Sequence, residues 1–295
     1  MESTVFDLMK VSPAVQANLR NMGIRKPMPV QQRAIPALLN GRDVLARAQT
    51  GTGKTLAYLV PLAQKVDPAR NYVQGLVLTP TRELAQQVHE VLKEVAAGLG
   101  LKTLAVTGGR DFETQKRKLQ GNAQILIGTP GRLLAHIANS GIDLSHVSYF
   151  VLDEADRMLD MGFIHDIRRI LPLLPEKRQT LFFSATMPDD IVKLANTMLR
   201  KPAHVTVTPP ASVVETIRQS VLFAEKAEKR TLLASLLRER PESSVLVFSR
   251  TKHGADRIAR ILTKAGIEGR AIHGDKSQGA RERAMNDFRS GACRV

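Results

Sequence analysis

Short apolar runs recur along most of the chain, separated by longer segments whose apolar residues follow helical spacing. We predict a β-strand for each run, because the runs are too short for a helix and turn-forming residues flank them. In the first part of the chain the expected strands are residues 43–46, 75–79, 101–106, 124–128, 148–152, 180–184 and 204–207. The run from Tyr149 to Leu152 lacks alternating polar residues, which is typical of a strand covered by helices on both faces. With expected helices at 83–97 and 191–199, the pattern predicts an α/β fold built on a doubly wound parallel sheet.

The alternation stops at residues 206–212, which include Pro209 and Pro210, and then resumes. The later expected strands are 216–223, 244–249 and 270–272, and the expected helices are 227–238, 252–265 and 279–289. We therefore predict a first domain over residues 1–208, a linker over 209–215 and part of a second domain over 216–295. The stretch after the linker is too short for a complete doubly wound unit, so we expect this second domain to be incomplete.

Composition narrows the class of protein. Of the 295 residues, 43% are hydrophobic and 24% are charged, which suits globular domains with substantial cores. No apolar run approaches the roughly 20 residues that a membrane-spanning helix needs, which excludes an integral membrane protein. The one cysteine, Cys293, cannot form an internal disulfide, and the N-terminal residues do not resemble an export signal. We expect a cytoplasmic protein with no membrane partner, in which Cys293 is a small apolar residue.

The charge balance points towards a polyanionic partner. The chain has 43 Lys and Arg against 28 Asp and Glu, a net charge of +15, and a pI near 10.3. Nucleic acid is the leading partner class, although solvated basic surfaces would give the same balance. Aromatic residues make up only 4%, which argues against base stacking as the main contact. We expect contacts to the nucleic-acid backbone, with little sequence preference and strong salt dependence.

A glycine-rich segment follows the first expected strand and precedes a helical pattern. In this context glycine amides and a helix N-terminus bind phosphate, Lys54 neutralises the outer phosphates and Thr55 ligates Mg²⁺. A glycine-rich turn without a ligand is the alternative. The candidate nucleotide-binding residues are Ala48, Gln49, Thr50, Gly51, Thr52, Gly53, Lys54 and Thr55.

An acidic cluster, Asp153 to Asp156, follows the run that ends at Leu152. Ligands of open α/β sheets gather at the carboxyl ends of strands. Asp153 is therefore a candidate Mg²⁺ ligand, and Glu154 a candidate base that orients the attacking water. A carboxylate cluster that caps a helix is the alternative.

Together these blocks resemble the DEAD-box ATP-dependent RNA helicases, over nearly the whole chain. The matching blocks are residues 27–31, 48–55, 80–85, 108–109, 129–132, 153–156, 184–186, 247–250, 273–275 and 278–281. The surroundings of Arg157 to Phe163 and of Thr251 to Gly254 look most similar to the bacterial RhlE-type branch.

The resemblance implies ATP and Mg²⁺ as cofactors and assigns further roles around them. Gln31 would read the adenine edge, with Phe6 stacked on the ring, and Lys54, Asp153 and Glu154 would act in hydrolysis. Ser184 and Thr186 would couple the nucleotide state to RNA-dependent closure. On composition alone a core or docking aromatic is the favoured interpretation of Phe6, and an ordinary helix start is the alternative for residues 184–186. Ile24 and Met28 depart from the family's usual aromatic and hydroxyl residues, which loosens the expected adenine specificity.

RNA is the partner that the resemblance implies, bound by residues of both domains. The expected RNA-binding residues are Pro80, Thr81, Arg82, Gly109, Arg110, Thr129 and Arg132 in the first domain, and Arg250, His273, Gly274, Asp275, Gln278 and Arg281 in the second. For His273 taken alone, a surface or hydrogen-bonded histidine is the default interpretation. By family we also expect a monomer that meets proteins of ribosome assembly or RNA decay.

Two blocks of the family pattern, Ala-Arg-Gly-Leu/Ile-Asp and His-Arg-x-Gly-Arg-x-Gly-Arg, do not occur before Val295. The second supplies arginine fingers, which typically contribute about a thousandfold or more to phosphoryl transfer. We therefore expect a truncated helicase, and two functional hypotheses stay open: an RNA-dependent ATPase and helicase, or an ATP- and RNA-binding module with little turnover. An enzyme of the same nucleotide-binding class that acts on a small molecule is a third.

Overall fold

The computed structural model describes residues 5–49, 51–207 and 218–295. The chain divides into two compact units, Met1–Val214 and Glu215–Val295, and each is described by itself. The expected linker, 209–215, lies outside the described residues. Within the described ranges no helix combines the length and apolar character required to span a membrane.

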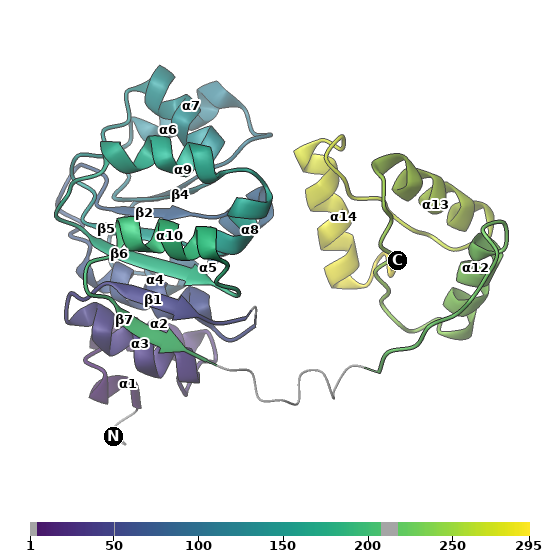
Figure 1. Ribbon diagram of the computed structural model, residues 1–295, viewed down its shortest axis with the longest axis horizontal. Coiled ribbons are helices and arrows are strands. Elements are labelled where there is room, and N and C mark those ends of the chain that lie inside the picture. Colours follow the sequence, from purple (N-terminus) through teal and green to yellow (C-terminus); the bar gives the residue numbers. More distant parts are fainter. Residues whose placement is uncertain (1–4, 50, 208–217) are drawn as a thin grey trace. The chain divides into compact units, whose positions relative to one another are not determined.

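A seven-stranded parallel sheet forms the centre of the first unit (Figure 1). The strands are β1 (Val44–Arg47), β2 (Gly75–Leu78), β3 (Thr103–Val106), β4 (Ile125–Gly128), β5 (Tyr149–Leu152), β6 (Gln179–Ser184) and β7 (Ala203–Thr206). Their order across the sheet is β3-β4-β2-β5-β6-β1-β7. All seven expected strands are found within two residues of their predicted limits, and the predicted fold class is confirmed.

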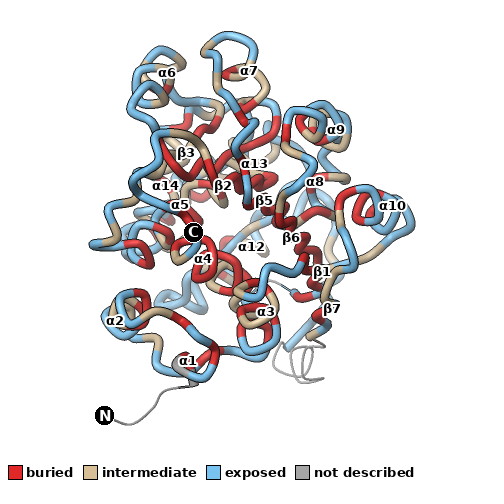
Figure 2. The backbone as a smooth tube through the Cα atoms, turned by 90° about the vertical axis from the view of Figure 1, so that its left-hand side faces the viewer, coloured by how far each residue is buried: buried red, intermediate tan, exposed pale blue. Residues whose placement is uncertain are grey.

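Helices cover both faces of this sheet, and each face has its own apolar core. The first core is shared with α1 (Val5–Leu8), α2 (Pro13–Asn21), α3 (Pro29–Leu39), α4 (Lys54–Lys65) and α5 (Arg82–Val95). The second is shared with α6 (Phe112–Leu119), α7 (Pro130–Ser140), α8 (Ala155–Asp160), α9 (Ile164–Ile170), the short helix η1 (Leu171–Leu173) and α10 (Asp189–Met198). Neighbouring residues of β6 show why both faces need cover, since Phe182 enters the second core and Phe183 the first. In Figure 2 the central strands β2, β5 and β6 are accordingly buried, whereas the edge strands β3 and β7 are partly exposed.

The second unit contains α12 (Lys229–Glu239), α13 (Lys252–Lys264) and α14 (Gln278–Ser290), close to the predicted helices. The three predicted strands are wrong in the residues described, because 218–223, 244–249 and 270–272 are not part of any sheet. A strand needs a ladder of partners. Here Val245 N–H donates to the Arg294 carbonyl (2.8 Å) and Arg270 N–H to that of Val295 (3.0 Å). These bonds involve the last two residues and are too few to form a ladder.

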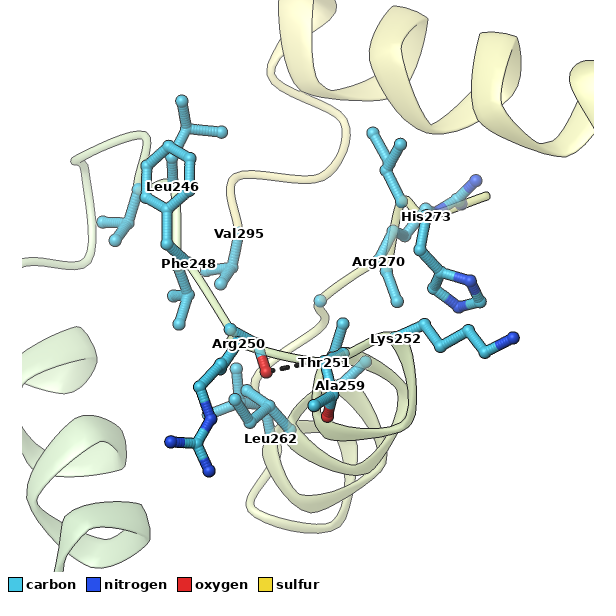
Figure 3. Close-up of a pocket in the computed structure, with 18 residues that line it drawn as sticks. Leu246, Phe248, Arg250, Thr251, Lys252, Ala259, Leu262, Arg270, His273 and Val295 are labelled. Carbon is cyan, nitrogen blue, oxygen red and sulfur yellow. Dashed lines mark hydrogen bonds between the residues drawn. The ribbon is translucent and has the colours of Figure 1, made fainter. Parts of the chain in front are cut away.

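The core of the second unit is correspondingly small. Only Ala234, Leu237, Leu262 and Ile267 form its buried apolar cluster among the described residues. A pocket of about 380 Å³ opens between the segments that would pair as strands (Figure 3). Leu246 and Phe248, on one of those segments, are 68% and 92% exposed. Apolar residues with strand periodicity are thus present, but they lack a layer to pack against.

Phe150 in β5 is fully buried, so Phe150→Ala should lower the free energy of unfolding of the first unit by about 3–5 kcal/mol. Urea denaturation followed by circular dichroism measures this change. The matched control is Phe248→Ala, which removes the same ring from an exposed site and should change stability by about 0.5 kcal/mol or less. Equal effects of the two substitutions would contradict the assignment of the core.

Candidate nucleotide site and nucleic-acid interface

Three neighbouring strands, β1, β6 and β5, end at the same edge of the sheet and bring together segments that are distant in sequence. The glycine-rich loop follows β1, Asp153 follows β5, and Ser184 ends β6 between them. The Ala48 N–H donates to the Ser184 carbonyl (3.0 Å), which ties the start of the loop to the middle strand. This edge is the usual ligand position in an open parallel sheet.

The loop holds its backbone in a conformation that requires glycine. Gly51 and Gly53 both have φ of +85°, and Gly53 is the N-cap of α4. A Cβ atom on Gly53 would lie 2.5 Å from Gln31 Nε2, so glycine is needed for space as well. The hydroxyl of Thr52 donates to the Gln49 carbonyl (2.7 Å), and Thr50 lies outside the described residues. The free amides at the start of α4 and its dipole make this a site for an anion.

Lys54 is the first residue of α4 and is 7% exposed, yet its Nζ makes no hydrogen bond with any described residue. A buried ammonium that makes no hydrogen bond is unfavourable, because it has lost the hydrogen bonds that water would give it. A phosphate group at the loop would supply the missing acceptors. The donor set thus fits a nucleotide phosphate.

Asp153 lies beside this lysine and is 2% exposed. Its Oδ1 accepts from the Glu154 N–H (2.9 Å), and its Oδ2 accepts from the hydroxyl of Tyr58 (2.8 Å). Burial raises the pKa of Asp153 above its usual value, while the charge of Lys54 and the Tyr58 hydrogen bond oppose that rise. A Mg²⁺ ion would fit one carboxylate, the Thr55 hydroxyl and phosphate oxygens, since Mg²⁺ commonly binds through few protein ligands. No group of three or more His, Cys, Asp and Glu side chains suited to a metal occurs within the described ranges.

Glu154 has a backbone conformation that is rare for a residue with a side chain. Its φ is +53° and ψ is +51°, at the N-cap of α8. Its side chain is 15% exposed and lies 3.4 Å from the guanidinium of Arg157. Left-handed backbone at a non-glycine residue costs about 1–3 kcal/mol and is often found at functional sites.

A hydrogen-bonded network connects the acidic cluster to the end of β6. Asp156 Oδ2 accepts from both the N–H and the hydroxyl of Thr186, each at 2.8 Å. The Ser184 hydroxyl donates to the Thr186 carbonyl (2.7 Å) and accepts from the Asp156 N–H (3.2 Å). Burial would raise the pKa of Asp156, but the bonds from Thr186 and Ser184 hold it below its usual value. The sequence predicted no separate site role for Asp156, although the position of this residue in the acidic block was a usable signal.

The residues expected at the adenine ring are buried. Gln31 is 2% exposed, its Oε1 accepts from the Met28 N–H (2.9 Å), and its Nε2 donates to the Gly53 carbonyl (3.0 Å). Phe6 is 3% exposed and belongs to the first core. Gln31 thus links α3 to the glycine-rich loop, and Phe6 has the environment of a core aromatic. Their contacts with adenine stay predictions.

The RNA-binding residues expected in the first unit follow three adjacent strands, β2, β4 and β3, and so share one edge of the sheet. Thr81 caps α5 by accepting from the Leu84 N–H (3.2 Å). Arg132 donates to the Arg110 carbonyl (2.6 Å), and its guanidinium lies 4.8 Å from the centre of the Phe112 ring. The structure therefore brings this set together. In order of strand, the set is Pro80, Thr81 and Arg82 after β2, Gly109 and Arg110 after β3, and Thr129 and Arg132 after β4.

In the second unit the expected RNA-binding residues lie at the starts of α13 and α14. Lys252, in the first turn of α13, forms an ion pair with Asp275 (2.6 Å). Asp256 lies 2.8 Å from Lys276 Nζ and 3.1 Å from His273 Nε2. These contacts hold the segment before α14 against α13. The full set is Arg250, His273, Gly274, Asp275, Gln278 and Arg281.

Three kinds of comparison place the chain in a family. The family model "DEAD/DEAH box helicase" matches residues 28–194, and "Helicase conserved C-terminal domain" matches residues 228–295. The chain belongs to the DEAD/DEAH box helicase family.

Individual relatives agree with that class. The chain is 40% identical to the DEAD-box ATP-dependent RNA helicase CshA of Geobacillus kaustophilus, over 99% of the chain and 62% of that protein. It is 41% identical to CshA of Bacillus subtilis, over 98% of the chain and 57% of that protein. The chain thus spans less than two thirds of the length of these relatives. Their name does not support the narrower resemblance to the RhlE-type branch.

Solved structures give the same class. A DEAD box protein from Methanococcus jannaschii matches with a TM-score of 0.67 and 36% identity, over 100% of this chain and 80% of that one. Dbp5 of S. cerevisiae, bound to RNA and ADP BeF3, matches with a TM-score of 0.86 and 30% identity, over 99% of this chain and 75% of that one.

Gly53→Ala should weaken nucleotide binding, because the new methyl group displaces Gln31 and distorts the loop. The control is Gly141→Ala, at a φ of +65° where a Cβ meets no atom within 4 Å. Both substitutions should carry a backbone penalty of about 1–2 kcal/mol in thermal unfolding. Only Gly53→Ala should reduce binding of a fluorescent ADP analogue, and unchanged binding would contradict the described packing of the loop.

Hydrogen bonding from Lys276, followed by the contact with His273, lowers the pKa of Asp256 to about 2. The unfolded value is about 3.9, so this carboxylate stabilises the fold above about pH 4, and the contribution is lost as the pH falls through about 2. Lys276→Met should therefore raise the pKa of Asp256 towards its ordinary value. Carboxyl ¹³C NMR titration measures the midpoint, and Lys264→Met, which alters no described partner of Asp256, should leave it unchanged.

Proposed function

We propose that this chain is an RNA-stimulated ATPase of the helicase type, with its ATP and Mg²⁺ site at the edge formed by β1, β6 and β5. The observation that carries the proposal is the buried ammonium of Lys54, without a hydrogen bond to any described residue, at a helix N-terminus beside buried Asp153. The names of its relatives as ATP-dependent RNA helicases support the same activity.

Each residue of the site has a chemical task in this proposal. The glycine-rich loop and Lys54 bind the phosphates, and Thr55 and Asp153 hold Mg²⁺, which neutralises phosphate charge when bound. Glu154 orients the attacking water. The bonds of Asp156 to Thr186 and Ser184 connect the acidic block to the end of β6. Through this connection, binding of ATP would affect binding of RNA.

RNA is the proposed second ligand, bound along the edge that follows β2, β4 and β3. This edge offers the N-termini of α5 and α7, together with Arg82, Arg110 and Arg132, to a phosphate backbone. Aromatic residues make up only 4% of the chain. Backbone contacts and low sequence preference suit that composition better than base stacking does. Contact with proteins of ribosome assembly or RNA decay, a monomeric state and a cytoplasmic location are part of the same proposal.

A second candidate function is ATP- and RNA-binding with little turnover. The 295 residues contain no His-Arg-x-Gly-Arg-x-Gly-Arg block, so they offer no arginine finger of the family type. Residues 1–295 tested by themselves would then retain binding and hydrolyse ATP about a thousandfold more slowly than with such a finger.

Lys54→Ala should lower ATP affinity at least about tenfold, because the phosphates lose their buried cation. Equilibrium binding of labelled ATP and release of phosphate, each with and without RNA at low salt, measure the two functions separately. The control is Lys193→Ala, which removes a lysine with a side chain that is 76% exposed. Binding without RNA-stimulated phosphate release would favour the second candidate, and absence of ATP binding by the unaltered chain would contradict both.

A further inference from the structure

Tyr58 occupies a position that the functional blocks of the sequence do not include. It lies in α4, one helical turn after Lys54, and is fully buried. Its ring packs against Phe183 of β6, with centroids 5.3 Å apart. Its hydroxyl donates to Asp153 Oδ2 (2.8 Å), so a phenol in the core reaches the carboxylate at the candidate metal site.

The two hydrogen bonds of the Asp153 carboxylate connect it to different parts of the chain. The bond from the Glu154 N–H is local, between neighbouring residues, and moves with the chain at that point. The bond from Tyr58 joins α4 to the end of β5 across 95 residues of sequence. It therefore fixes the carboxylate relative to the helix that begins with Lys54 and Thr55. Tyr58 also lies three residues after Thr55, where side chains of a helix are neighbours.

Another tyrosine shows that a hydroxyl in this core does not require a partner. Tyr149 in β5 is 2% exposed, and its hydroxyl is buried without a hydrogen bond to any described residue. It is the first residue of β5, the strand that ends immediately before Asp153. The two tyrosines are thus similar in burial and differ in whether the hydroxyl contacts the carboxylate.

We propose that Tyr58 is a positioning residue for the metal-binding carboxylate, with its hydroxyl holding Asp153 in the orientation that Mg²⁺–nucleotide requires. The inference rests on the proposed nucleotide site. Tyr58 acts through Asp153, and its phenol serves the metal-dependent part of nucleotide binding. The glycine-rich loop and Lys54 serve the metal-independent part.

Tyr58→Phe tests this role, because it keeps the ring against Phe183 and removes only the hydroxyl. The affinity of a fluorescent ADP analogue is measured with Mg²⁺ and with EDTA, and Mn²⁺ binding in the presence of ADP is followed by electron paramagnetic resonance. We expect the gain in affinity on adding Mg²⁺, and the affinity for Mn²⁺, to fall about tenfold, as a lost hydrogen bond to a charged group does. Affinity in EDTA should stay within about twofold of the unaltered protein.

Tyr149→Phe is the matched control, since it removes a buried hydroxyl with no such contact, and it should leave both affinities unchanged. In a background of Asp153→Asn, adding Tyr58→Phe should have no further effect on the metal dependence, as expected for two residues that act through one contact. These results together would support the positioning role.

Other outcomes would overturn it. A Tyr58→Phe protein whose ADP affinity falls by the same factor with Mg²⁺ and with EDTA would show a structural role alone. A protein in which both affinities and the gain on adding Mg²⁺ are unchanged would show no role. If neither the unaltered chain nor Tyr149→Phe binds nucleotide, the proposed function itself fails. Loss of binding in Lys54→Ala alone leaves that function intact. The role of Tyr58 is then decided by the Tyr58→Phe measurements.

Discussion

The parallel pairing of β5, β6 and β1 is the constraint on which the candidate site depends. The register sets Leu152 opposite Phe182 and Arg47 opposite Ser184. The chain therefore leaves β5 and β1 on either side of the end of β6, and the Ala48 bond to Ser184 extends this pairing into the glycine-rich loop. A lysine, two carboxylates and a serine from three distant segments meet because parallel strands end at a common edge.

Two unfavourable features are concentrated at this edge. Lys54 is buried without a partner among the described residues, and Glu154 has a left-handed backbone. Both are tolerated because the surrounding unit has two extensive cores that hold α4 and β5 in place. A site that already holds its cation and carboxylate in position has less reorganisation to undergo when phosphate arrives. The same rigidity makes a single buried hydroxyl, that of Tyr58, able to orient a charged group.

The second unit shows that helices form from local hydrogen bonds, whereas strands need partners that are distant in sequence. The three helices described in this unit form where their pattern predicts them, since their hydrogen bonds are internal to each segment. The predicted strands 244–249 and 270–272 do not pair with each other, and their ladder-like bonds are those of Val245 and Arg270 to Arg294 and Val295. Phe248 is of a residue type that is common in buried strands, yet it is exposed. Neither a hydrogen-bonded ladder nor a covering layer is present for it among the described residues. A segment with strand periodicity therefore forms a strand only where another segment is present to pair with it.

Pattern and composition alone established the α/β class, the seven strands of the first unit, the helices near 83–97 and 191–199, and the three helices described in the second unit. They also singled out the two blocks that contain Lys54 and Thr55, and Asp153 and Glu154. These features are local, since each depends on residues within one run or one turn. Strand order, the burial of Lys54, the bond from Tyr58 to Asp153 and the network of Asp156 with Thr186 arise only when the chain folds. Gln31 illustrates the difference: its position in a block was evident from the sequence, but its bond to the Gly53 carbonyl was not. A hydrogen bond between residues far apart leaves no periodic signal in the sequence, because it is the packing of the whole sheet that brings donor and acceptor within 3 Å.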